Sequence, residues 1–102
     1  TGSFPAKGYL GVEYQMISQD AAELNSVPQG AYVVRVVAGS PAEVGGIRAQ
    51  DIITKIDGEE LSSDNTLGDV VSKKKPGDVL QLEIWRNNQA IKLTLTLSEF
   101  SQ

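Results

Sequence analysis

The chain has 102 residues, of which 40% are apolar and 22% charged, values typical of one soluble globular domain. Its net charge of −4 argues against binding to nucleic acid or to an anionic membrane surface. The absence of Cys and His excludes disulfides and thiolate metal sites and removes the usual general base. No apolar run reaches the roughly 18 residues of a membrane span, so we expect no membrane insertion.

The chain begins with Thr rather than Met, so we interpret it as a fragment of a longer protein with residues 1–7 as a linker or cloning remnant. Residues 9–16 then alternate apolar and polar side chains, which predicts a half-buried strand. Gly11 lies inside this strand, and a glycine there indicates either a simple bulge or a close approach to the backbone. A tight glycine turn can aim successive N–H groups at one point and so bind an anion.

The next segments carry local start and stop signals. Residues 18–24 predict a short helix or a loop, and the β-branched run 31–37 predicts a mostly buried strand. Ser40, Pro41 and Glu43 predict a short helix with a capping box, which Gly45 or Gly46 ends.

The second half contains the main helix and the last strands. Residues 51–56 predict a strand followed by an Asp57-Gly58 turn. The main helix is predicted from residue 65 to about 74, with its cap supplied by residues 62–64. Strands at 79–85 and 90–97 are predicted to form a hairpin through the turn at 86–89.

These elements predict a small α+β domain with five or six strands in a curled antiparallel sheet, a partly open barrel, capped by two helices. The predicted domain spans residues 8–97, and residues 98–102 form a C-terminal tail. Nothing in the spacing of carboxylates or serines indicates a catalytic, metal or cofactor site, so we expect none in this chain.

Four motifs resemble bacterial PDZ domains, most of all those attached to HtrA/Deg-type trypsin-like serine proteases. They are the Tyr9-Leu10-Gly11-Val12 loop, Ser40-Pro41-Ala42 with Gly46-Ile47, Asp51-Ile52-Ile53 with Asp57-Gly58, and Lys75-Pro76-Gly77-Asp78 before a strand that ends in Arg86. The resemblance covers Gly8 to Leu97. Gln50, where the family usually has glycine, and Asn87-Asn88, in place of a common Asp-Gly turn, depart from the pattern.

The resemblance implies a binding site for the free C-terminus of a peptide. The amides of Leu10, Gly11 and Val12 would hold the carboxylate, and Val12–Met16 would pair with the peptide by strand addition. Of the helix residues, Val70 is favoured to face the pocket for the last side chain, and Thr66 to face the third residue from the peptide end. The complete predicted site is Tyr9, Leu10, Gly11, Val12, Glu13, Tyr14, Met16, Thr66, Leu67, Val70 and Val71.

Three functions remain open from the sequence. The first is a non-catalytic module that captures C-terminal peptides of unfolded or partner proteins, within a bacterial protease of protein quality control whose protease domain would be a second partner. The second is an assembly domain whose groove is self-occupied or used for contacts within an oligomer. The third, an enzyme in its own right, is disfavoured because no serine has a histidine partner. The family resemblance implies an extracytoplasmic location.

Overall fold

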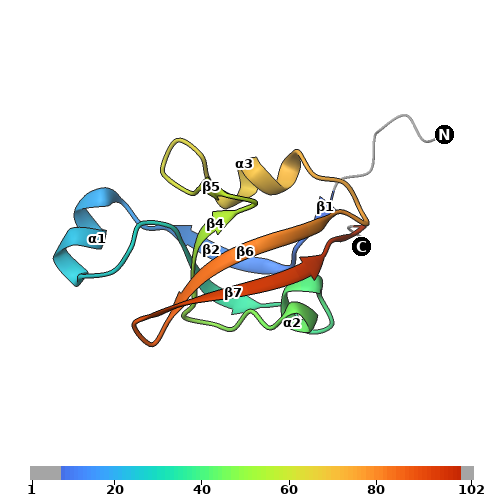
Figure 1. Ribbon diagram of the computed structural model, residues 1–102, viewed down its shortest axis with the longest axis horizontal. Helices are drawn as coiled ribbons and strands as arrows, with labels where there is room; N and C mark the ends of the chain where they lie inside the picture. The colour runs from blue at the N-terminus through green and yellow to red at the C-terminus, as the bar shows by residue number, and fades with distance from the viewer. Residues whose placement is uncertain (1–7, 100–102) are drawn as a thin grey trace.

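The computed structural model describes residues 8–99, so the predicted linker and the last three residues of the predicted tail lie outside the described part. Figure 1 shows an antiparallel sheet with α1 projecting at one end and β1, Gly8–Tyr9, at the other. Five strands lie in the order β2-β3-β4-β6-β7, and β5 pairs with β4. Their bounds are β2 Val12–Met16, β3 Ala31–Val36, β4 Ile52–Ile56, β5 Glu59–Glu60, β6 Val79–Arg86 and β7 Gln89–Thr96.

The predicted α+β class and six-stranded antiparallel sheet are confirmed, but the described part of the chain has three helices rather than two. These are α1 Gln19–Asn25, α2 Pro41–Gly45 and α3 Leu67–Ser72. The segment 18–24, expected to be a short helix or a loop, is the helix α1. The other two pack on the sheet, α2 along β7 and α3 beside β2, to which the Gly68 N–H bonds through the Tyr14 hydroxyl. No helix in residues 8–99 is long and apolar enough to span a membrane.

The single strand predicted over residues 9–16 is interrupted. Gly8–Tyr9 forms β1, which pairs with β8, Ser98–Glu99, whereas the next strand begins only at Val12. Between them, Leu10 and Gly11 form a loop whose carbonyl oxygens accept from Ala42 N–H and Val37 N–H, both over 2.9 Å. These bonds to residues distant in the sequence divide the strand. They also make the first residues of the predicted tail part of the fold.

The predicted local signals mostly form as expected. Ser40 caps α2 through its hydroxyl, Pro41 occupies the first turn, and Gly46 ends the helix in the left-handed conformation with φ 96°. The capping box is incomplete, because Glu43 Oε1 accepts from Gly39 N–H over 2.8 Å and not from the Ser40 amide. Both departures from the family pattern are accommodated by positive φ angles, since Gln50 has φ 77° and the Asn87-Asn88 hairpin has φ 52° and 63°.

The predicted start of the main helix is wrong. Ser62 and Asn65 bond to each other's backbone in a tight turn, so residues 62–64 do not cap the helix. Thr66 is the cap, and it forms a complete capping box with Asp69. The helix therefore starts at Leu67 and is a short element of 6 residues, held in place by its packing rather than by its length.

The core lies between the sheet and the two packed helices. Its fully buried side chains include Val33, Ile53, Ile56, Leu80, Leu82 and Ile84 from the strands and Leu67 and Val70 from α3. Because Leu67 and Val70 are both buried, the helix presents its next residues, Gly68 and Val71, to the edge of the sheet. This orientation determines which helix residues reach the candidate site.

Candidate functional site

A small pocket of about 180 Å³ lies between the start of β2 and α3. It is lined by eight residues from two stretches of the chain, 9–14 and 67–71: Tyr9, Leu10, Gly11, Val12, Tyr14, Leu67, Gly68 and Val71. No Asp, Glu, Lys or Arg lines the pocket. Any anion bound there by the lining residues would therefore be held by neutral hydrogen-bond donors and not by a cation.

The loop at the closed end of the pocket presents its backbone amides. The peptide units are trans, so the C=O of one residue and the N–H of the next point in opposite directions. The carbonyls of Leu10 and Gly11 bond to Ala42 and Val37, which turns the Gly11 and Val12 amides the other way. Within residues 8–99, neither Leu10 N–H nor Gly11 N–H donates a hydrogen bond. The loop thus offers a cluster of unused donors.

Only glycine fits at position 11. Its φ is 91°, and a Cβ atom there would lie 2.2 Å from the Ser40 Cβ and 2.6 Å from the Ser40 Oγ. Ser40 is 4% exposed and donates from its hydroxyl to the Gly11 carbonyl over 3.4 Å, while the same oxygen caps α2. The Ser40-Pro41-Ala42 motif therefore buttresses the loop from behind.

The other side of the pocket opens onto a free strand edge, because β2 pairs only with β3 among the described strands. Val37 N–H bonds to the Gly11 carbonyl and Ile17 N–H to the Gly30 carbonyl, so the Val12–Val36 and Met16–Ala31 pairs are of the non-hydrogen-bonded type. Val33, which lies opposite Tyr14, points its backbone groups away from β2: its N–H donates to the Asp51 carbonyl and its C=O accepts from the Gln50 N–H.

It follows that Val12, Tyr14 and Met16 all point their backbone N–H and C=O groups toward the free edge. The side chains of these three residues are half-buried on one face, whereas those of Glu13 and Gln15 are exposed on the other. An extended peptide can pair with this edge while placing alternate side chains in the pocket.

Seven of the eleven residues predicted for the site line this pocket, and four do not. Glu13 is exposed and forms an ion pair with Arg35 across β2 and β3, and Met16 lies beyond the pocket near α1. Thr66 uses its hydroxyl to cap α3, accepting from Asp69 N–H over 3.1 Å. The expectation that Val70 faces the groove is wrong, since Val70 is 1% exposed in the core and Val71 takes its place.

Gly68 is the pocket residue that the sequence did not identify. Its N–H donates to the Tyr14 hydroxyl over 2.7 Å, and a Cβ atom at this position would lie 2.7 Å from that oxygen. The sequence did give one signal, since a glycine inside a predicted helix destabilises the helix by about 1 kcal/mol relative to alanine and is therefore expected to have a specific role. The close approach of Tyr14 supplies the reason.

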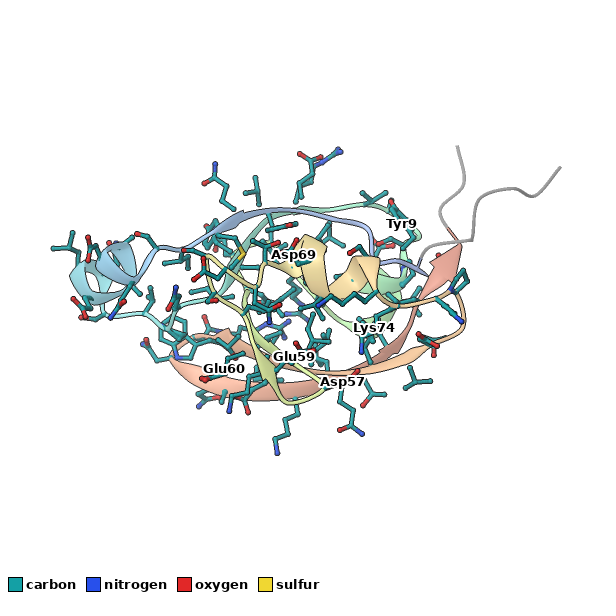
Figure 2. All side chains as sticks on the ribbon, turned by 90° about the horizontal axis from the view of Figure 1, so that it is seen from above. Tyr9, Asp57, Glu59, Glu60, Asp69 and Lys74 are labelled. Atoms are coloured by element: carbon teal, nitrogen blue, oxygen red, sulfur yellow. The ribbon has the colours of Figure 1, made fainter. Side chains whose placement is uncertain are left out.

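Two ion pairs lie outside the pocket. Lys74 Nζ donates to Asp57 Oδ2 over 3.0 Å and ties the end of α3 to the β4–β5 turn (Figure 2). The hydrogen bond from Gln81 N–H lowers the pKa of Asp57 below its ordinary value, and Lys74 lowers it further against the opposing effect of burial. Arg86 donates to both oxygens of buried Asp51 and to the Gly46 carbonyl, and its bonds to Asp51 raise the pKa of Arg86.

The sequence profile of the PDZ domain matches residues 8–97. The chain belongs to the PDZ domain family. Two relatives, both named probable periplasmic serine endoprotease DegP-like, come from Chlamydia trachomatis and Rhizobium meliloti. They are 35% and 32% identical over 91% and 90% of this chain, and the aligned part is 19% of each relative. The chain thus spans about a fifth of their length.

PDZ domains of HtrA proteases are also similar in structure. An HtrA-type protease, AlgW, solved with a decapeptide, superposes with a TM-score of 0.80 at 28% identity, over 95% of this chain and 30% of AlgW. The HtrA3 PDZ domain bound to a phage-derived ligand gives a TM-score of 0.75 at 29% identity, over 92% of this chain and 88% of that one. The PDZ domain is a binding module.

Proposed function

We propose that this PDZ domain binds the free C-termini of polypeptides with an apolar last residue by strand addition. The observation that carries the proposal is the cluster of unused amides at Leu10, Gly11 and Val12, at the closed end of an uncharged pocket and next to a free strand edge. Backbone N–H groups bind a carboxylate through charge-assisted hydrogen bonds, which are stronger than neutral ones. They therefore recognise the terminal carboxylate without a cation.

The apolar lining recognises the last side chain. Val12, Leu67 and Val71 provide aliphatic surface around the pocket, with Leu10 at its floor and Tyr14 as one wall. Burial of one apolar side chain contributes about 1.5–3 kcal/mol. Together with main-chain pairing along Val12, Tyr14 and Met16, this supports micromolar affinity, on the order of −7 to −8 kcal/mol. Tyr9 lines the pocket beside the loop, and Thr66 supports the helix wall by capping α3.

In the whole protein, the domain captures substrates or regulates an attached serine protease. Its relatives are named periplasmic serine endoproteases, which supports an extracytoplasmic protein with a protease domain as the second partner. In this scheme the protease chemistry belongs to that other domain.

A titration with one peptide in two forms tests the proposal. A fluorescent peptide ending in Val with a free carboxylate is compared with the same peptide carrying a C-terminal amide. Amidation removes the charge and crowds the loop, so affinity falls at least tenfold, about 1.4 kcal/mol. Equal affinities would refute the carboxylate loop. If neither form binds until residues 100–102 are removed, the groove is self-occupied and the domain serves assembly instead.

A further inference from the structure

The strand β8, at the end of the described chain, holds the residues that lead into the carboxylate loop. It pairs with β1 through two residue pairs, Gly8 with Glu99 and Tyr9 with Ser98, in a small sheet separate from the main one. The Leu10 N–H, one of the proposed carboxylate donors, belongs to the peptide unit between Tyr9 and Leu10. Because that unit is planar, the direction of this N–H depends on the backbone of Tyr9, and therefore on the pairing with β8.

The residue before β8 connects the same segment to the chain that follows α3. Leu97 is 2% exposed, its N–H donates to the Asp78 carbonyl and its C=O accepts from the Gly77 N–H, both over 2.9 Å. Gly77 and Asp78 lie in the connection from α3 to β6. Residues 97–99 therefore contact both the strand before the carboxylate loop and the connection after the helix wall of the pocket.

β8 can separate from β1 without loss of the core. A two-stranded ribbon is at best marginally stable by itself in water, and here it has two residue pairs and an exposed Ser98. Leu97 keeps its burial and its bonds when β8 separates, and the carbonyls of Leu10 and Gly11 keep theirs, because none of these bonds involves β8. Separation of β8 therefore frees only the Tyr9 side of the carboxylate loop.

We propose that β8 is a regulatory contact through which the chain that follows the domain controls peptide binding. Paired with β1, it holds the carboxylate loop in the conformation that binds; pulled away by an attached module, it lets the loop lose that conformation. The coupling is reciprocal, so a bound peptide also strengthens the pairing of β8 and reports occupancy of the groove to that module. The inference rests on the peptide-binding function proposed above.

Proline substitution tests the effect of β8 on the groove. Ser98→Pro combined with Glu99→Pro removes the N–H donor of β8, whichever of the two residue pairs exchanges hydrogen bonds. The matched control, Ser98→Ala with Glu99→Ala, removes the same two side chains and keeps both N–H groups. In fluorescence titrations with a free-acid peptide ending in Val, the proline variant binds at least about fivefold more weakly than wild type, the lower end of typical coupling between two sites. The alanine variant keeps the wild-type affinity, and equal affinities of the two variants would overturn the proposal.

Hydrogen exchange in the wild-type domain protects the test against a folding defect in the proline variant. Saturation with the peptide slows amide exchange in β8, whose residues do not line the pocket. The control amides are those of Arg86 and Gln89, the last pair of the β6–β7 hairpin, at the opposite end of the sheet from β1 (Figure 1), and their exchange is unchanged. Unchanged exchange in β8 of a domain that binds the peptide would overturn the coupling and leave the peptide-binding function intact. If the wild-type domain binds no peptide, the peptide-binding function itself fails, and the inference fails with it.

Discussion

Replacing Gly11 with alanine gives the most quantitative test of how the loop is built. An alanine at φ 91° meets left-handed backbone strain of about 1–2 kcal/mol. The new Cβ also lies 2.2 Å from the Ser40 Cβ, and this overpacking adds about 1–3 kcal/mol because Ser40 is fixed at the start of α2. We expect Gly11→Ala to lower the free energy of unfolding by roughly 2–5 kcal/mol in urea titrations.

The chain provides a control that separates the two contributions. Gly58 also has a positive φ, 82°, but a Cβ atom there meets nothing within 4 Å, so Gly58→Ala carries the backbone strain alone. Ser40→Gly removes the clashing Cβ and costs only a few tenths of a kcal/mol as a cap. Combined with Gly11→Ala, it therefore recovers about 1–3 kcal/mol in a double-mutant cycle. The reasoning is refuted if Gly11→Ala costs no more than Gly58→Ala and the cycle shows no coupling.

Three further predictions concern the helix wall and the two ion pairs. Val71→Lys weakens binding of a free-acid peptide at least tenfold and changes the free energy of unfolding by less than about 1 kcal/mol, whereas Val70→Lys unfolds the domain in circular-dichroism melts. The reverse result would mean that α3 is rotated about its axis. Arg86→Met leaves Asp51 buried without its cation and lowers the free energy of unfolding by about 3–5 kcal/mol, whereas Arg35→Met, at the exposed pair with Glu13, lowers it by less than about 1 kcal/mol. Equal losses of stability in urea titrations would contradict the importance of the buried pair. The pKa of folded Asp57 lies below its ordinary value of 3.8, so the ionised form stabilises the fold above that pH and this stabilisation is lost as the pH falls through the lower folded value. Asp57→Asn is therefore less stable than wild type at about pH 7, and the difference shrinks below about pH 4. A difference that stays constant with pH would contradict this.

Signals that act within a few residues were readable from the sequence. Ser40 and Pro41 start α2, and Asn87-Asn88 forms the hairpin turn, because the bonds and φ angles involved lie within the segment itself. The carboxylate-binding role of residues 10–12 was assigned through the resemblance to PDZ domains, since the sequence alone left Gly11 as a bulge or a close approach. The structure adds the reason for glycine there, a φ of 91° and no room for a Cβ atom beside Ser40.

The features that the sequence did not determine depend on distant contacts. The helix begins later than predicted, with Thr66 as its cap. Asn65 bonds instead to the Ser62 backbone and, through its side chain, to the Glu60 carbonyl, so residues 62–65 form a turn and not the first turn of the helix. Val70 and Val71 are adjacent valines, so their pattern alone does not show which one faces the core. That choice depends on how α3 packs against the sheet. The Tyr14–Gly68 contact joins residues 54 positions apart and has no local signal except the glycine.

The central claim is that the amides of Gly11 and Val12 hold a peptide carboxylate. The most direct test is a two-dimensional ¹⁵N–¹H NMR titration of the domain with the free-acid peptide and, separately, with its amide. A charge-assisted hydrogen bond shifts the proton resonance of its donor downfield. The account predicts large downfield shifts of the Gly11 and Val12 amides with the free acid that are absent with the amide. Shifts of equal size with both peptides, or shifts confined to residues outside the pocket, would contradict it.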